Sequence, residues 1–135
     1  MSKILLVVSA FILLNSHFKY DDPDCKKLKN GRFLYHSRFG NNDFFYLIIR
    51  KGTSQQEINQ KTGDTTTYFI EWTGSCSYNL YFKKNSNPGI NTKRQASKNL
   101  PIRTEILSVA NNYYIFRGKQ DNSAIELIDT LWIKK

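Results

Sequence analysis

The segment from Tyr68 to Phe82 constrains the fold more than any other part of the sequence. It holds two runs of aromatic and β-branched residues, which are separated by the turn-forming residues 73–75. Within each run large apolar side chains recur at every second position, the spacing that places them on one face of a β-strand. The second run begins with Cys76, one of only two cysteines. We therefore predict a β-hairpin whose second strand carries a covalent anchor.

The rest of the chain repeats this succession of strand patterns and turns. Short runs rich in aromatic and β-branched residues are bounded by turns that contain Gly, Asn or Asp, which predicts further strands at 32–36, 44–51, 55–60, 102–110, 113–117 and 124–133. Short connections favour antiparallel neighbours in sequence order. We expect an all-β fold, in which an antiparallel meander of about eight strands forms a curled sheet or lipocalin-like barrel after an N-terminal signal helix.

The N-terminus has the pattern of a secretory signal peptide. Lys3 precedes an uncharged apolar run from Ile4 to Leu14, and small polar residues follow. Such a run would span about 16 Å as a helix, roughly half of the hydrocarbon core of a bilayer, which is too short for a retained transmembrane segment. We predict cleavage after Ser16, a single β domain over 17–135, and a periplasmic or secreted location. A buried first strand is the alternative interpretation of the run.

Export would place the cysteines in an oxidising compartment. Since Cys25 and Cys76 are the only two, we predict one disulfide between them. Closing a loop of about fifty residues would contribute roughly 4 kcal/mol in the chain-entropy model. Lipid attachment at Cys25 is disfavoured, because Asp22, Pro23 and Asp24 stand where a small apolar motif would be needed.

What the sequence lacks excludes several classes of enzyme. His36 is the only histidine apart from His17 beside the predicted cleavage point, so neither a multi-histidine metal site nor a Ser-His-Asp triad can be built. Glycine-rich phosphate-binding motifs are also missing. We expect no cofactor, no metal and no catalytic residue of these kinds, and we interpret His36 as a strand-surface residue.

Polar and aromatic residues on the predicted strands are the candidates for a binding site. An eight-stranded barrel leaves room for side chains or one small ligand. Arg50 and Glu57 flank Gly52, and a four-residue loop would place them opposite each other as an ion pair. If both faced the interior, Arg50 would suit a carboxylate or phosphate of a ligand. The further ligand-binding candidates are Glu71, Trp72 and Tyr78, although core packing is the alternative role of the two aromatic residues.

Asp129 interrupts the apolar register of the last predicted strand. Ile125, Leu127, Leu131 and Ile133 share its face. An ionised carboxylate is costly to bury without a partner. We predict a bulge or bend near Asp129 and Thr130, with a buried catalytic carboxylate as the alternative.

Positive charge is concentrated in one segment. The formal net charge is +9, and residues 83–103 contain basic residues but no acidic one. We predict a long basic loop here, with one helical turn near 95–98. It could contact a polyanion, or it could simply keep the protein soluble. The basic surface candidates are Lys83, Lys84, Lys93, Arg94, Lys98 and Arg103.

Several segments also resemble a known group of proteins. These are residues 25–33 (CKKLKNGRF), 49–52 (IRKG), Gln56-Glu57, Glu71-Trp72 and 76–80 (CSYNL). They resemble small exported, cysteine-pair β-proteins of Bacteroidetes-type bacteria, a family with no established function. Some members carry an automated topoisomerase label, which this sequence does not support because no ATP site or metal-bound tyrosine is visible. The resemblance implies an extracytoplasmic bacterial protein and adds Gln56 to the ligand-binding candidates Arg50, Glu57 and Trp72.

Three functions remain open from the sequence. The first is an exported, non-enzymatic binding protein with a β-barrel-like scaffold, whose partner is an unknown small ligand or envelope component. The second is a cationic surface-interaction module that contacts anionic envelope polymers, lipid or nucleic acid through Lys83 to Arg103. The third is a carboxylate-dependent hydrolase with two acids in one cleft. In each case we expect a monomer without a transmembrane span in the mature form.

Overall fold

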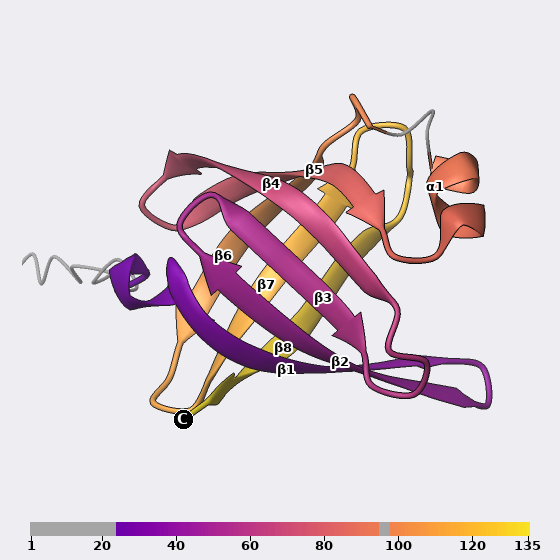
Figure 1. Ribbon diagram of the computed structural model, residues 1–135. Coiled ribbons are helices and arrows are strands. Elements are labelled where there is room, and N and C mark those ends of the chain that lie inside the picture. Colours follow the sequence, from indigo (N-terminus) through magenta and orange to yellow (C-terminus); the bar gives the residue numbers. More distant parts are fainter. Residues whose placement is uncertain (1–23, 95–97) are drawn as a thin grey trace, which may run out of the picture.

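The computed structural model describes residues 24–94 and 98–135. Within these ranges eight antiparallel strands follow one another in sequence order and close into a single barrel (Figure 1). The strands are β1 (Asn30–Phe39), β2 (Asn42–Lys51), β3 (Ser54–Asn59), β4 (Thr65–Gly74), β5 (Ser77–Asn85), β6 (Ile102–Val109), β7 (Tyr113–Gln120) and β8 (Glu126–Lys134). The predicted all-β meander is confirmed. The predicted signal peptide and its cleavage point lie outside the described residues.

Barrel closure depends on the pairing of the first strand with the last. β1 forms ten registered residue pairs with β2 but only three with β8. We call this short β1–β8 contact the closing seam. Because closure leaves no free sheet edge, β3 pairs with both β2 and β4. The inward face of β3 is polar and borders a cavity.

The two ends of the barrel are different (Figure 1). One end carries the β2–β3, β4–β5 and β6–β7 turns, and the 3-10 helix η1 (Lys26–Leu28) lies beside it. The opposite end carries the β7–β8 turn and helix α1 (Pro88–Arg94). Within the described ranges, no helix is long and apolar enough to cross a membrane.

The predicted basic loop is wrong at both of its ends. Lys83 and Lys84 belong to β5, and Arg103 belongs to β6. The helix occupies 88–94 and so precedes the predicted helical turn at 95–98, of which residues 95–97 lie outside the description. The helix begins where it does because the Asn87 side chain accepts a hydrogen bond from the Gly89 N–H at 3.0 Å, and Pro88 fits the first helical position.

The predicted bulge at Asp129 is also wrong. β7 and β8 pair without interruption from Tyr113–Trp132 to Lys119–Glu126, so Asp129 keeps the inward register of its neighbours. The carboxylate is instead satisfied by the Tyr35 hydroxyl, which donates to Asp129 Oδ2 at 3.1 Å, and by the Thr130 N–H, which donates to Oδ1 at 2.7 Å. A hydrogen-bond partner on β1, which is far away in the sequence but adjacent to β8 in the barrel, takes the place of the local distortion that the sequence suggested.

Candidate functional site

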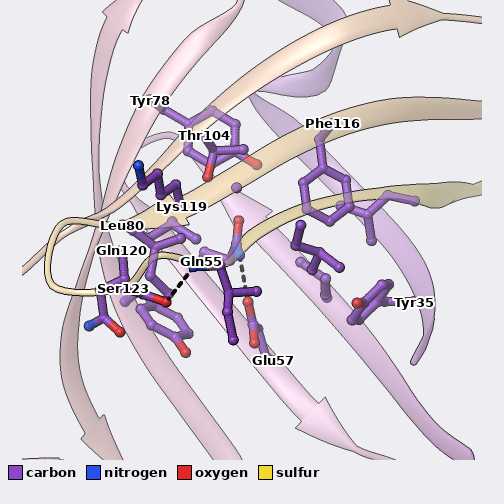
Figure 2. Close-up of a pocket in the computed structure, with 17 residues that line it drawn as sticks. Tyr35, Gln55, Glu57, Tyr78, Leu80, Thr104, Phe116, Lys119, Gln120 and Ser123 are labelled. Carbon is purple, nitrogen blue, oxygen red and sulfur yellow. Dashed lines mark hydrogen bonds between the residues drawn. The ribbon is translucent and has the colours of Figure 1, made fainter. Parts of the chain in front are cut away.

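A cavity of about 380 Å³ occupies part of the barrel interior (Figure 2). One part of its wall is apolar, and another carries polar groups from β1, β3 and β4. Ile48, Leu80, Ile102, Phe116 and Leu131 form the apolar part; Tyr35, Gln55, Glu57 and Tyr68 form the polar part; and Lys119, Gln120, Ser123, Ile125 and Leu127 lie toward the β7–β8 turn. We call this hollow the Glu57 cavity. Its mixed lining suits a small molecule with an apolar body and a polar group.

Glu57 is the charged group of the polar wall. It lies on β3, and Gln55 Nε2 donates a hydrogen bond to Glu57 Oε1 at 2.9 Å (Figure 2). Protein surrounds the carboxyl group although part of its surface faces the hollow. This desolvation raises the pKa of Glu57, while the Gln55 hydrogen bond and the positive charges of Arg94 and Arg50 oppose the rise. The carboxyl group is therefore easier to protonate than one in water.

Two tyrosines beside Glu57 have their hydroxyl groups engaged. Tyr35 donates to Asp129, as described, and its burial is the main cause that raises its pKa to about 12. Tyr68 accepts a hydrogen bond from Arg94 Nη1 at 2.9 Å, and its pKa is also raised, chiefly by burial. Both tyrosines therefore stay protonated at neutral pH.

Next to the cavity, the Arg50 side chain fills the end of the barrel that lies beside η1, which we call the closed end. The residue is only 1% exposed. Its Nε donates to Gln55 Oε1 at 3.0 Å, its Nη1 to the Leu28 carbonyl at 2.8 Å, and its Nη2 to the hydroxyls of Tyr78 and Tyr114 at 3.0 Å each. A buried cation is stable only when its donors are satisfied, and here every guanidinium nitrogen has an acceptor.

Aromatic rings enclose the same guanidinium group. Its central carbon lies 4.9 Å from the ring centroid of Phe33, 4.8 Å from that of Tyr78 and 5.8 Å from that of Trp72. The Trp72 indole N–H donates to the Gly52 carbonyl at 3.2 Å, which ties the ring to the β2–β3 turn. We call this cluster the arginine plug; it consists of Arg50, Leu28, Phe33, Trp72, Tyr78 and Tyr114.

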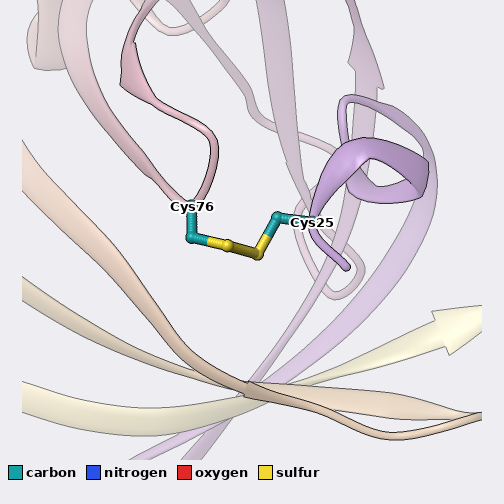
Figure 3. The surroundings of a disulfide bond; sticks show 2 residues. All are labelled: Cys25 and Cys76. Atoms are coloured by element: carbon teal, nitrogen blue, oxygen red, sulfur yellow. A yellow bond between two sulfur atoms is a disulfide. The ribbon is translucent and has the colours of Figure 1, made fainter. Parts of the chain in front are cut away.

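The disulfide holds η1 against this plug. Cys25 precedes η1, Cys76 lies in the turn between β4 and β5, and their bond confirms the predicted pairing across 51 positions (Figure 3). Leu28, at the end of η1, is 1% exposed and supplies the carbonyl that accepts from Arg50. The crosslink therefore helps to position one acceptor of the buried cation.

The expected opposition of Arg50 and Glu57 is wrong. The β2–β3 turn has two residues rather than four, because Gly52 adopts a φ of 56° that a tight hairpin turn favours. Arg50 consequently pairs with Gln55, and Glu57 pairs with Ile48. The Gln55 side chain lies between the two charges: its oxygen faces Arg50 and its nitrogen faces Glu57.

The structure separates the other sequence-predicted candidates. Tyr78 contributes to the plug and also borders the cavity, whereas Trp72 belongs to the plug. Gln56 and Glu71 are exposed on the barrel exterior, where Asn79 donates a hydrogen bond to Glu71 at 3.3 Å. Neither exterior residue reaches the interior, because the side chains of a strand alternate between its two faces.

The basic surface candidates are also dispersed. Arg103 forms a two-pronged ion pair with Asp121, at 2.6 and 3.0 Å. Arg94 bonds Tyr68 and lies 4.3 Å from the Phe82 ring centroid, so it caps barrel side chains. Lys83, Lys84 and Lys93 are exposed, and Lys98 is half-buried in the turn before β6.

Sequence reasoning missed Gln55, Tyr35 and Tyr68 as site residues. Gln55 shares the strand face of Glu57, two positions away, so the alternation that predicted β3 could have identified it. The two tyrosines resemble ordinary core residues in the sequence, and only the closed barrel brings them beside Glu57.

The described part of the chain contains no group of three or more His, Cys, Asp or Glu side chains that could hold a metal ion. Comparisons of the chain with protein-family models, curated proteins and solved structures gave no match.

Proposed function

We propose that this chain is an exported, non-enzymatic binding protein that holds one small amphipathic ligand in the Glu57 cavity. The observation that carries the proposal is the cavity itself: about 380 Å³ inside a closed barrel, with an apolar wall and a few convergent polar groups. A barrel of this strand number has room for one small ligand once its side chains leave part of the interior unfilled.

Two features support a location outside the cytoplasm. The Cys25–Cys76 disulfide fits an oxidising compartment. The basic, apolar and small-residue pattern of residues 1–16 is that of a secretory signal peptide. Such a protein would meet its ligand in the periplasm or in the medium.

Gly118 offers a way to fill the cavity with little disturbance of the barrel. It lies on β7, is buried and borders the hollow. A Cβ added there would meet Phe116 Cε2 at 3.7 Å and Ile102 Cγ2 at 3.9 Å, which are ordinary van der Waals contacts. The Gly118→Leu variant should therefore fold and place its side chain in the space that a ligand needs.

The test uses N-phenyl-1-naphthylamine, a neutral apolar probe whose fluorescence rises in apolar surroundings. The parent protein should bind it, and Gly118→Leu should weaken binding by about tenfold or more because the added side chain overpacks the site. Gln56→Leu, which adds a leucine on the barrel exterior, is the matched control and should bind as the parent does. Equal binding by a folded Gly118→Leu variant, or no binding by the parent, would refute the proposal.

A further inference from the structure

We propose that the Glu57 cavity selects organic cations, meaning molecules with an aromatic or apolar body and a protonated amine. This inference rests on the proposed function and names the ligand class for the same site. It follows from three properties of the polar wall: the direction of its hydrogen bonds, the sign of its charge, and the aromatic rings beside it.

The polar wall around Glu57 offers a hydrogen-bond acceptor that the described residues do not use. Gln55 uses its oxygen on Arg50 and its nitrogen on Glu57 Oε1. Glu57 Oε2 has no hydrogen-bond partner among the residues that the structure describes. The Tyr35 hydroxyl donates to Asp129, and its oxygen already takes part in a hydrogen bond with Ser37. A ligand group that completes this wall must donate hydrogen bonds.

Glu57 is the one carboxylate among the described residues that line the cavity, although the whole chain is strongly basic. Of the nearby cations, Arg50 is enclosed in the plug, and Arg94 bonds Tyr68 and packs on Phe82. Glu57 forms none of the ion pairs found in the described ranges. The titratable groups that interact with Glu57 are Tyr35 from β1, Tyr46 and Arg50 from β2, Tyr68 from β4 and Arg94 from α1. Lys119 borders the cavity from β7 and is exposed.

Aromatic rings line the same cavity as this carboxylate. Tyr35 and Phe116 line the cavity and pack edge to face with their centroids 6.1 Å apart. An ammonium group next to Glu57 could bond the carboxylate while its charge interacts with ring faces. The arginine plug shows the same combination, with the chain's own cation against aromatic rings and oxygen acceptors.

The same cavity should disfavour an anionic ligand. Its charge would face Glu57 across a cavity with a largely apolar lining, unless Glu57 first took up a proton. A cation instead stabilises the ionised carboxylate that burial disfavours. The +9 net charge of the chain suggests an anionic partner for the surface, but the cavity wall has the reverse preference.

The test compares three indoles that differ in the end of a short side chain: tryptamine, which is a cation, tryptophol, which is neutral, and indole-3-acetate, which is an anion. Isothermal titration calorimetry on the folded protein should give about tenfold tighter binding of tryptamine than of tryptophol, because a hydrogen-bonded charge pair is added. Indole-3-acetate should bind most weakly.

Glu57→Gln should remove the preference for tryptamine, because the amide keeps the shape and the acceptor for Gln55 but loses the charge. The matched control is Glu71→Gln, the same change on the barrel exterior, and it should keep the preference. Between pH 8 and pH 5 tryptamine stays protonated, so its affinity should fall as Glu57 takes up a proton, whereas tryptophol binding should not change.

The outcomes separate this inference from the proposed function. Equal affinities, tightest binding of indole-3-acetate, or failure of tryptamine to bind would overturn the cation preference. If N-phenyl-1-naphthylamine still binds and is excluded by Gly118→Leu, the proposed function stands in each of those cases. A preference for tryptamine that persists in Glu57→Gln would also overturn the inference, because the charge would then come from elsewhere.

Discussion

The arginine plug and the Glu57 cavity each contain a buried charged group, but the two groups differ in how fully they are hydrogen-bonded. Arg50 has an acceptor for every guanidinium nitrogen and rings around it, so nothing further is needed there. Glu57 has one hydrogen bond, a raised pKa and empty space beside it. The difference indicates that the plug is complete as a structural element, whereas the cavity wall keeps an acceptor that the proposed ligand would bind.

Gln55 connects these two regions. Arginine can only donate, so the Gln55 oxygen must face Arg50 and the amide nitrogen remains for Glu57. The plug thereby fixes the orientation of a residue in the cavity wall. Changes at the closed end should consequently reach the site, and the following variants test how far the two regions are independent.

Loss of the disulfide should have the largest effect. Replacing both Cys25 and Cys76 by alanine removes a crosslink across 51 positions and should cost about 4 kcal/mol of unfolding free energy, measured by urea denaturation. The plug should be disrupted more than the cavity, because the disulfide no longer holds Leu28 against Arg50. A loss below about 1 kcal/mol would show that η1 stays in place without the bond.

Replacement of the buried cation should come second. Arg50→Met keeps much of the side-chain volume but strands the acceptors around it, and we expect a loss of about 2–3 kcal/mol by the same measurement. Arg32→Met, on an exposed position of β1, is the matched control and should change stability by less than about 0.5 kcal/mol. If the two variants were equally stable, the plug would contribute packing alone.

Glu57→Gln should have the smallest effect on stability, and it should stabilise the protein rather than destabilise it. Burial raises the pKa of Glu57 in the folded state above the ordinary glutamate value of 4.5. The unfolding free energy of the parent protein therefore falls as the pH rises from 4.5 through the raised pKa. Glutamine has no such penalty, so the variant should melt at a higher temperature than the parent at pH 8. The difference should shrink toward zero at pH 4. Glu71→Gln should show no comparable trend, and a destabilised Glu57→Gln at pH 8 would contradict the contrast.

The strands and the disulfide could be predicted because their signals are local. Alternation along a segment such as Cys76 to Phe82 is set by burial of one face, and two cysteines allow one pairing. The inward placement of Glu57 was likewise open to sequence reasoning as one of two alternatives. These features depend on neighbours within a few positions or on simple counting.

The rest of the site depends on register and on partners far along the chain. One positive φ at Gly52 shortened a turn and replaced Glu57 by Gln55 opposite Arg50. Asp129 was satisfied by Tyr35, which is 94 positions away. The alternation of apolar residues along one strand specifies neither the length of the next turn nor a partner that lies far along the chain.

The closing seam has a consequence for how this chain reaches its fold. Its three residue pairs join positions roughly one hundred residues apart, so the last hydrogen bonds of the barrel carry the greatest cost in loop closure and should form late. Until they form, β1 and β8 each present an unpaired edge that could recruit the same strand of another molecule. Newly made chains would then be most prone to exchange strands or aggregate just before the barrel closes.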